Sequence, residues 1–294
     1  MNNLCVPDNI KVHFAGVENQ NYINAVSAMG VNYALYSAFP FVQKKIFSKN
    51  KTLTETDLKT PKELDKKMRH IIQDSGLFSL LYGSKKHLAT KETIFKWYDA
   101  LVEYTLEHGV NVTVVEIDCQ DVLGTKVAWD LRKRLRNDLP NNRQMNVFHL
   151  SDGVKGLDEL IEFSDYIGVG SGAPYNSSAT MYEVSKYIKS KNPKIDIHLL
   201  GCTTLSTLKK CHFCTSCDSI SWKTPLRFGY IEDYHINGLD SVKVRSLVGD
   251  KVYDFIRQNN SELSTTASCI AIEYHKRLYE KYAGNQDYTI TFNK

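Results

Sequence analysis

Two aspartates in this sequence stand where a carboxylate could do glycosidic chemistry. Asp74 ends an apolar run and precedes the turn-forming residues Ser75 and Gly76. Asp218 lies inside the apolar run 216–222, where a carboxylate is costly unless it is paired or put to use. Two carboxylates that face one ligand can divide the work: one attacks an anomeric carbon, and the other handles the proton of the departing or arriving group. Taken alone, Asp74 is better explained as the cap or turn residue of a following helix.

The elements that would position these aspartates alternate regularly along the chain. Short β-branched or aromatic runs predict eight strands, at residues 10–15, 32–39, 70–74, 112–118, 145–150, 166–170, 195–200 and 216–222. Amphipathic patterns predict helices between them, at residues 93–107, 126–135, 157–163, 179–189 and 205–210. This alternation implies parallel strands joined by right-handed crossovers.

Eight such units in 294 residues fit a closed barrel better than an open sheet. An open dinucleotide-binding sheet would also need a Gly-rich turn after the first strand, which residues 16–19 do not supply. We therefore predict an α/β fold, a (β/α)8 TIM barrel over about residues 10–240 within a single domain spanning 1–294. Two extra C-terminal helices, at residues 242–258 and 264–282, would pack outside it and occupy the stretch of about 241–282.

The carboxyl ends of the predicted strands collect acids and glycines. In chain order these ends are Gly16, Ser37, Asp74, Asp118, Asp152, the segment 170–172, Gly201 and Asp218. In a TIM barrel the active site lies at this end of the strands. The third and eighth strands would therefore bring Asp74 and Asp218 to one pocket.

The motifs around both aspartates resemble those of a known family. Residues 74–79, Asp-Ser-Gly-Leu-Phe-Ser, are similar to the D-S-G-G-[FY]-Q acid/base motif of the tRNA-guanine transglycosylase superfamily, whose members exchange guanine for a 7-deazaguanine base on a β/α barrel. Residues 217–230 resemble most closely its DNA-modifying branch, the phage and bacterial DpdA proteins, in which D-S-x-S-W precedes a basic residue and Y/F-G. Residues 14–18 and 35–37 also look like that branch. The similarity is low in identity but ordered along nearly the whole chain.

The resemblance implies a role for each matching position. Asp218 would be the nucleophile that displaces guanine and holds the sugar covalently, and Asp74 would position or deprotonate the incoming base. Asp118 would recognise the base through its N1–H and amino group, while Gly170 and Ser171 would contact it through the backbone. The remaining base-pocket candidates are Ser75, Gly76, Phe78, His149 and Asp152. The implied ping-pong exchange requires no redox or nucleotide cofactor.

The substrate expected from the resemblance is DNA that contains guanine. The tRNA enzymes carry a zinc site after the nucleophile, with C-x-C-x-x-C and a distant histidine, whereas a single cysteine, Cys269, and two histidines, His235 and His275, follow here. This absence favours DNA as the substrate, with tRNA as the alternative. The incoming base would be like 7-cyano-7-deazaguanine.

Basic residues could supply contacts to the phosphates of such a substrate. The net charge of +4 permits a polyanionic partner without requiring one. Residues 44–69 are rich in lysine and form either solvated helix faces and loops or, taken together, a basic loop beside the active site. We expect phosphate contacts at Lys44, Lys45, Lys223 and Arg227.

Four cysteines between residues 202 and 217 raise the alternative of a metal site. Cys211, Cys214 and Cys217 form C-x-x-C-x-x-C, a spacing typical of zinc or iron–sulfur centres. The predicted topology separates Cys202, after the seventh strand, from Cys211 and Cys214, before the eighth. Buried thiols are therefore favoured, with zinc as the alternative.

Composition limits the class of protein. Hydrophobic residues make up 42% and charged residues 24% of the chain, as in soluble globular proteins. No apolar run approaches the roughly 20 residues of a membrane helix, and the N-terminus lacks a secretion signal. Seven cysteines, an odd number, indicate reduced thiols in the cytoplasm, the host cytoplasm if the protein is phage-encoded.

Two further function classes remain open. A glycoside hydrolase could use the same two acids, but it would hydrolyse and would need exposed aromatic platforms that the sequence does not identify. A non-catalytic nucleic-acid-binding barrel would be unaffected by loss of Asp218.

Overall fold

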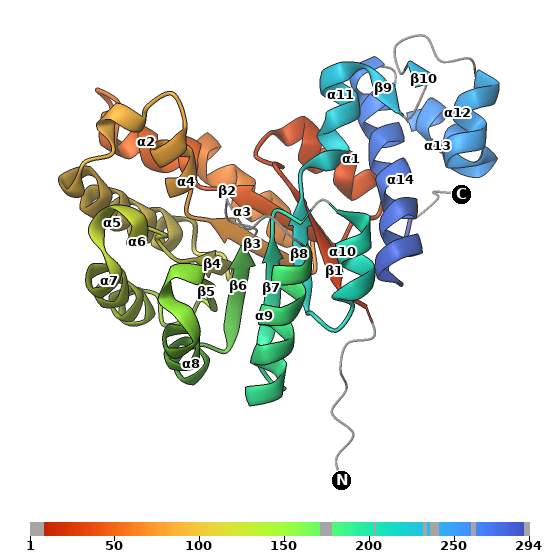
Figure 1. The fold of residues 1–294 in the computed structure, drawn as a ribbon. Coiled ribbons are helices and arrows are strands. Elements are labelled where there is room, and N and C mark those ends of the chain that lie inside the picture. The colour runs from red at the N-terminus through yellow and green to blue at the C-terminus, as the bar shows by residue number, and fades with distance from the viewer. Residues whose placement is uncertain are drawn as a thin grey trace.

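Eight parallel strands close into a barrel in the computed structural model, which describes residues 9–170, 178–202, 204–231, 234–235, 241–259 and 263–290 (Figure 1). The strands are β1 (Lys11–Ala15), β2 (Tyr33–Ser37), β3 (His70–Asp74), β4 (Thr113–Val115), β5 (Gln144–Phe148), β6 (Tyr166–Gly170), β7 (Asp196–Leu200) and β8 (Ser216–Ser219). Each strand pairs with the next, and β8 pairs with β1, with His13 beside Asp218. The predicted TIM barrel is confirmed.

Helices follow the strands and surround the barrel. They are α1 (Gln20–Ala28), α2 (Phe39–Phe47), α3 (Glu55–Lys67), α4 (Leu77–Tyr82), α5 (Lys91–His108), α6 (Gln120–Leu123), α7 (Thr125–Asp138), α8 (Gly153–Phe163), α9 (Ser178–Lys191) and α10 (Leu205–Lys210), with short 3-10 turns η1 (Lys86–Leu88), η2 (Leu150–Asp152) and η3 (Ser221–Lys223). All five helices predicted between the strands are present, and α5 and α8 are longer than expected.

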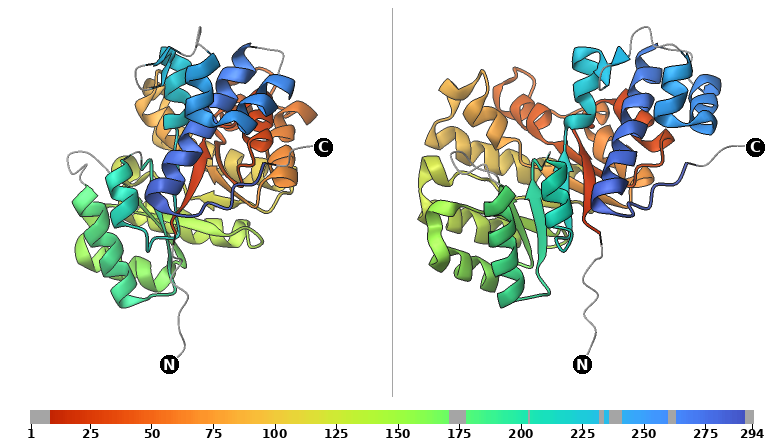
Figure 2. Two further views of the ribbon diagram at one scale, coloured as in Figure 1. Left: turned by 90° about the vertical axis from the view of Figure 1, so that its right-hand side faces the viewer. Right: turned by 45° about the vertical axis from the view of Figure 1, so that its right-hand side comes forward.

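The chain after β8 forms a C-terminal segment: α11 (Thr224–Phe228), β9 (Tyr230–Ile231), β10 (Tyr234–His235), α12 (Ser241–Val248), α13 (Asp250–Asn259) and α14 (Leu263–Ala283). Helix α14 packs against α1 and α10 on the outside of the barrel. Figure 2 shows α12 and α13, in blue, beyond the carboxyl end of the barrel. None of the helices in the described ranges is long and apolar enough to cross a membrane.

Several predicted boundaries differ from the structure, and three of them differ for local reasons. The single helix expected at 242–258 is two helices, because Gly249 has a left-handed φ of 82° between α12 and α13. The strand expected at 112–118 has only three residues, so Asp118 lies in the loop beyond it. The run 216–222 leaves the strand at Ser219 and turns into η3.

The basic stretch 44–69 is not a loop, which corrects the expectation for this segment. It contains the end of α2 and all of α3, joined by a short connection. Thr54 begins α3 as a capping box, since the Thr54 N–H donates to Asp57 Oδ2 at 2.7 Å and the Asp57 N–H donates to Thr54 Oγ1 at 3.4 Å.

Strand alternation decides which side chains face the barrel interior. The interior contains a small apolar cluster, which comprises Ile72, Val115, Met145, Val147 and Tyr166. A larger core lies between the strands and the helices and includes Cys217. Because Cys217 faces outward, its neighbours on β8, Ser216 and Asp218, face inward.

Candidate active site

Asp218 points into the barrel near the carboxyl end of β8 and is held by two neighbours on the β7 side. Its Oδ1 accepts a hydrogen bond from the Gly201 N–H at 2.7 Å and lies 3.1 Å from His198 Nε2. Gly201 has a φ of 60°, a conformation that favours glycine. Within the described residues, Oδ2 has no hydrogen-bond partner, and the side chain is 13% exposed. A carboxylate with one oxygen held and the other open is suited to attack on a ligand.

Asp74 ends β3 and shapes the turn that follows it. Its Oδ2 accepts from Ser37 Oγ at 3.1 Å and from the Gly76 N–H at 3.0 Å. Gly76 has a φ of 74°, and a Cβ there would lie 2.6 Å from the Phe39 backbone nitrogen, so only glycine fits. The turn interpretation of Asp74 is therefore confirmed.

The surroundings of Asp74 also raise its pKa, which suits the residue to act as an acid. The pKa of Asp74 is raised to about 6, first by burial and to a smaller extent by the negative charges of Asp218 and Glu18. The hydrogen bonds from Ser37 and Gly76 act in the opposite direction. Asp74 ends β3 and Asp218 lies near the end of β8, so the two carboxyls belong to the same end of the barrel. A carboxyl with a pKa near 6 can both donate and accept a proton near neutral pH.

Ser75, Gly76 and Phe78 differ in what they offer a ligand. Ser75 is buried, and its carbonyl accepts from Trp97 Nε1 at 2.9 Å, so it anchors the turn to α5. Phe78 is 69% exposed and packs its ring 4.7 Å from that of Tyr82. Phe78 is therefore free of the core and available to a planar ligand.

Asp118 and His149 form a pair beyond the ends of β4 and β5. Their Oδ1 and Nε2 atoms are 2.7 Å apart, and the Asp118 side chain is 40% exposed. The hydrogen bond to Asp118 raises the pKa of His149. Nearby, Gln120 Nε2 donates to Asp152 Oδ1 at 2.6 Å, while Gln120 Oε1 is buried without a hydrogen-bond partner among the described residues.

A buried ion pair holds these two strand ends together. Glu116 accepts from Arg132 Nε and Nη2, both at 2.6 Å, and from the Val147 N–H at 2.8 Å. Asn146 Nδ2 also donates to Glu116, at 2.7 Å. With four donors, the buried charge of Glu116 is well compensated. The network fixes β4 against β5 and so fixes where the Asp118–His149 pair lies.

Of the two residues expected to contact a base through the backbone, the structure describes one. Gly170 is the last residue of β6 and is partly exposed at the barrel end. Ser171 lies outside the described residues.

The four cations predicted to contact phosphate form two pairs, and the first pair, Lys44 and Lys45, is held by carboxylates. Lys44 lies 2.5 Å from Asp57, and Lys45 lies 2.7 Å from Glu103 and 2.9 Å from Glu107. Lys45 would therefore have to exchange two carboxylate partners for a phosphate.

The second pair comes from η3, which ends at Lys223, and from α11, which contains Arg227. Lys223 Nζ donates to the Gly16 carbonyl and lies 4.3 Å from the centre of the Tyr22 ring. Its burial lowers its pKa. Arg227 is exposed beside the Phe228 ring, which is 63% exposed. Of the four predicted cations, Arg227 is the most accessible to a phosphate.

The cysteine cluster divides into two pairs of buried thiols. The Cys214 thiol lowers the pKa of Cys211, whereas burial followed by the neighbouring Cys202 thiol raises the pKa of Cys217. All of these thiols are free. In the part of the chain that the structure describes, no three His, Cys, Asp or Glu side chains are arranged to hold a metal ion.

Three residues at this end of the barrel were not expected from the sequence: Glu18, Gln120 and His198. Glu18 Oε1 accepts from the Ser37 N–H at 2.9 Å and so adds charge near Asp74. His198 could have been found by alternation, because it lies two residues before Leu200 on the inward side of β7. Gln120 follows Asp118 by two residues, but no local pattern indicates its contact with Asp152.

Comparisons with known proteins support the barrel fold and give no information on the chemistry. The sequence matches no protein-family model and no curated protein. The structure is similar to fructose-bisphosphate aldolase from Campylobacter jejuni, with a TM-score of 0.53 and 9% identity over 95% of this chain and 92% of that one. The likeness shows the fold alone. An enolase from the environmental sequencing of the Sargasso Sea aligns with a TM-score of 0.41 and 13% identity, over 72% of this chain and 54% of that one.

Proposed function

We propose that this protein is a transglycosylase that exchanges guanine in DNA for a 7-deazaguanine base, through a covalent glycosyl–Asp218 intermediate. The observation that carries the proposal is the pair of carboxyls at one end of the barrel, Asp218 with an open oxygen and Asp74 with a pKa of about 6. The motifs at residues 74–79 and 217–230 supply the choice of chemistry.

The proposed exchange is balanced over two half-reactions. Asp218 Oδ2 attacks C1′ of the deoxyribose, the bond to N9 breaks, and guanine leaves with that electron pair and a proton from Asp74. The incoming base then gives its N9 proton to Asp74, and N9 attacks C1′ and displaces Asp218. Asp74 therefore acts as an acid first and as a base second, which suits a pKa near 6.

The side chains around the two carboxyls offer recognition of a planar base. Asp118 can accept hydrogen bonds from a guanine-type N1–H and amino group, and the His149 and Gln120 side chains lie on the same side of the barrel end. Duplex DNA would have to flip the target guanine outward, at a cost of a few kcal/mol. Stacking on an exposed aromatic ring such as Phe78 would offset part of that cost.

The test of this function is incubation of the protein with 7-cyano-7-deazaguanine and, separately, single-stranded DNA, duplex DNA and tRNA, followed by nucleoside mass spectrometry. Deazaguanine in a deoxynucleoside is the expected result. Incorporation into tRNA alone would favour the alternative substrate. Guanine loss without incorporation would indicate a hydrolase, a class for which the structure does provide exposed aromatic side chains, at Phe78 and Phe228. No change in any substrate would overturn the proposal.

Loss of the Phe78 ring is expected to weaken binding of the nucleic acid. Phe78→Ala should raise the KM for DNA about tenfold, because stacking of one base on one aromatic ring contributes about 1–3 kcal/mol. Leu106→Ala is the matched control, since Leu106 is 61% exposed near the end of α5. Equal KM values for the two variants would show that Phe78 does not contact the DNA.

Removal of the Arg227 charge is expected to reduce the salt dependence of DNA binding. Arg227→Gln should lower the slope of log K against log salt by about 1, the change expected for one lost phosphate contact. Lys45→Gln should leave the slope unchanged, because Lys45 is held by Glu103 and Glu107. Fluorescence anisotropy at several salt concentrations measures this slope for both variants. A lower slope in Lys45→Gln and an unchanged slope in Arg227→Gln would contradict the phosphate contact at Arg227.

A further inference from the structure

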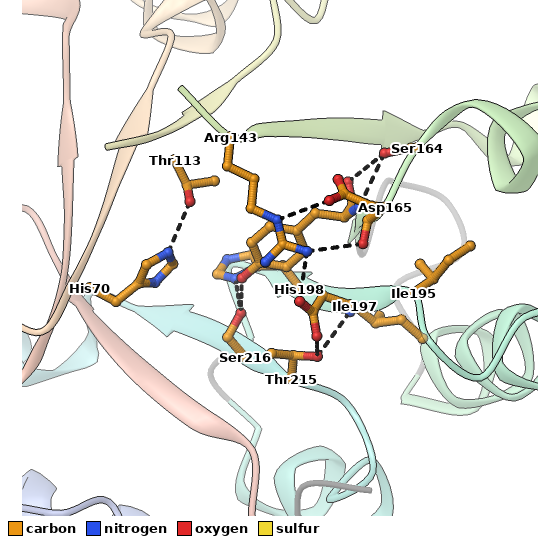
Figure 3. Close-up of polar contacts among 12 residues, drawn as sticks. His70, Thr113, Arg143, Ser164, Asp165, Ile195, Ile197, His198, Thr215 and Ser216 are labelled. Carbon is orange, nitrogen blue, oxygen red and sulfur yellow. Dashed lines mark hydrogen bonds and ion pairs between the residues drawn. The ribbon is translucent and has the colours of Figure 1, made fainter. Parts of the chain in front are cut away.

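A line of buried polar side chains runs beneath Asp218 inside the barrel. His198, from the middle of β7, is fully buried, and its Nε2 lies 3.1 Å from Asp218 Oδ1. On its other side, His198 Nδ1 lies 2.7 Å from Ser216 Oγ, which in turn lies 2.5 Å from the Tyr166 hydroxyl. Figure 3 shows the His198–Ser216 contact within the barrel. The line joins three neighbouring strands, β6, β7 and β8.

The chemistry of the two ends sets the direction of the hydrogen bonds. An ionised Asp218 can only accept, so the proton on the imidazole must be on Nε2. At the other end, burial raises the pKa of Tyr166, which keeps its hydroxyl protonated and able to donate. One arrangement satisfies both ends: Ser216 accepts from Tyr166 and donates to His198 Nδ1, and His198 Nε2 donates to Asp218. In this arrangement each group donates toward Asp218.

The groups around the line favour this arrangement. The His13 ring lies 5.8 Å from that of His198, and burial lowers the pKa of His13, so it brings no competing positive charge. The Arg143 guanidinium lies 4.5 Å from the centre of the Tyr166 ring and pairs with Asp196 at 2.7 Å. Arg143 thereby holds the Tyr166 ring from the amino-terminal end of the barrel.

We propose that His198, oriented by Ser216 and Tyr166, is the positioning residue of the nucleophile. It would fix Asp218 Oδ1 together with the Gly201 N–H, so that Oδ2 is turned to the ligand. The kinetic part of this inference rests on the proposed function of Asp218, whereas the tautomer of His198 does not. A histidine that merely filled the barrel would have no effect on the attack step.

The tautomer can be measured without any assay of activity. In the 15N-histidine-labelled protein, multiple-bond 1H–15N spectra distinguish a protonated ring nitrogen from an unprotonated one, and His198→Gln assigns the signal. We expect a neutral ring with its proton on Nε2, and a displaced Nδ1 signal in Ser216→Ala. A ring protonated on Nδ1, or a signal unaffected by Ser216→Ala, would overturn the proposal even if no base exchange is ever found.

The kinetic test uses the geometry of amide side chains. His198→Gln places an N–H where Nε2 was, whereas His198→Asn cannot reach Asp218. We expect His198→Asn to lower the rate of guanine release about 100-fold, the effect of a slightly misplaced reacting group, with KM unchanged, and His198→Gln to recover most of that loss.

The control for this series is His13→Gln, which alters an equally buried histidine that contacts His70 and the Cys217 carbonyl rather than Asp218. Its rate should stay near that of the unmodified protein. Equal losses in His198→Asn and His198→Gln, or a loss in KM alone, would overturn the positioning role. Thermal unfolding of each variant confirms that it is folded before rates are compared.

Discussion

Replacement of Asp218 by asparagine is expected to abolish base exchange and to preserve the fold. The amide oxygen still accepts from the Gly201 N–H, but it is too weak a nucleophile to displace guanine. We expect the rate of guanine release to fall about 10⁴-fold or more, as when a nucleophile is removed from other covalent enzymes. Release of labelled guanine from DNA measures the effect.

The control for Asp218→Asn is Asp196→Asn. Asp196 begins β7, at the amino-terminal end of the barrel, where it pairs with Arg143 at 2.7 Å. This change also removes one charge from the strands, but far from the proposed reaction. Asp196→Asn should keep most of the activity. If Asp218→Asn were as active as Asp196→Asn, Asp218 would not be the nucleophile.

Replacement of Asp74 by asparagine is expected to lower activity and raise stability. Loss of the acid/base group should slow both half-reactions about 10²- to 10⁴-fold. Asp74 has a folded pKa of about 6 against an ordinary value of 3.8. Its protonation therefore stabilises the fold fully below about pH 4, and this contribution is lost as pH rises through 6. Above pH 6 the ionised carboxyl costs about 3 kcal/mol, which asparagine avoids.

Two measurements check the Asp74 prediction. Urea unfolding at pH 8 should show Asp74→Asn more stable than the unmodified protein, and the difference should shrink toward zero at pH 4.5. Guanine release should decline as pH rises through 6, because the acid form of Asp74 donates the proton, and the variant should lose this dependence. A stability difference that did not change with pH would contradict the raised pKa of Asp74.

Much of the barrel could be predicted because its signals are local. Alternation along a short strand places Cys217 outward and Asp218 inward, and glycine after Asp74 indicates the turn. The split of the predicted helix 242–258 also has a local signal, Gly249, whose left-handed φ ends α12.

The side-chain partners could not be predicted because they are distant in the sequence. Nothing in the segment around Lys45 indicates a partner, yet its partners Glu103 and Glu107 belong to α5, about sixty residues later. Gln120 meets Asp152 only because β4 and β5 are adjacent. Such contacts depend on the packed barrel, and no local sequence pattern indicates them.

The most direct test of the account is to capture the glycosyl-enzyme. The protein is mixed with a guanine-containing DNA oligonucleotide in the absence of an incoming base, quenched with acid and analysed by intact-protein and peptide mass spectrometry. The account predicts an added mass equal to the oligonucleotide minus guanine, on the peptide that contains Asp218, and no adduct in Asp218→Ala. Guanine release without an adduct, or an adduct on another residue, would contradict it.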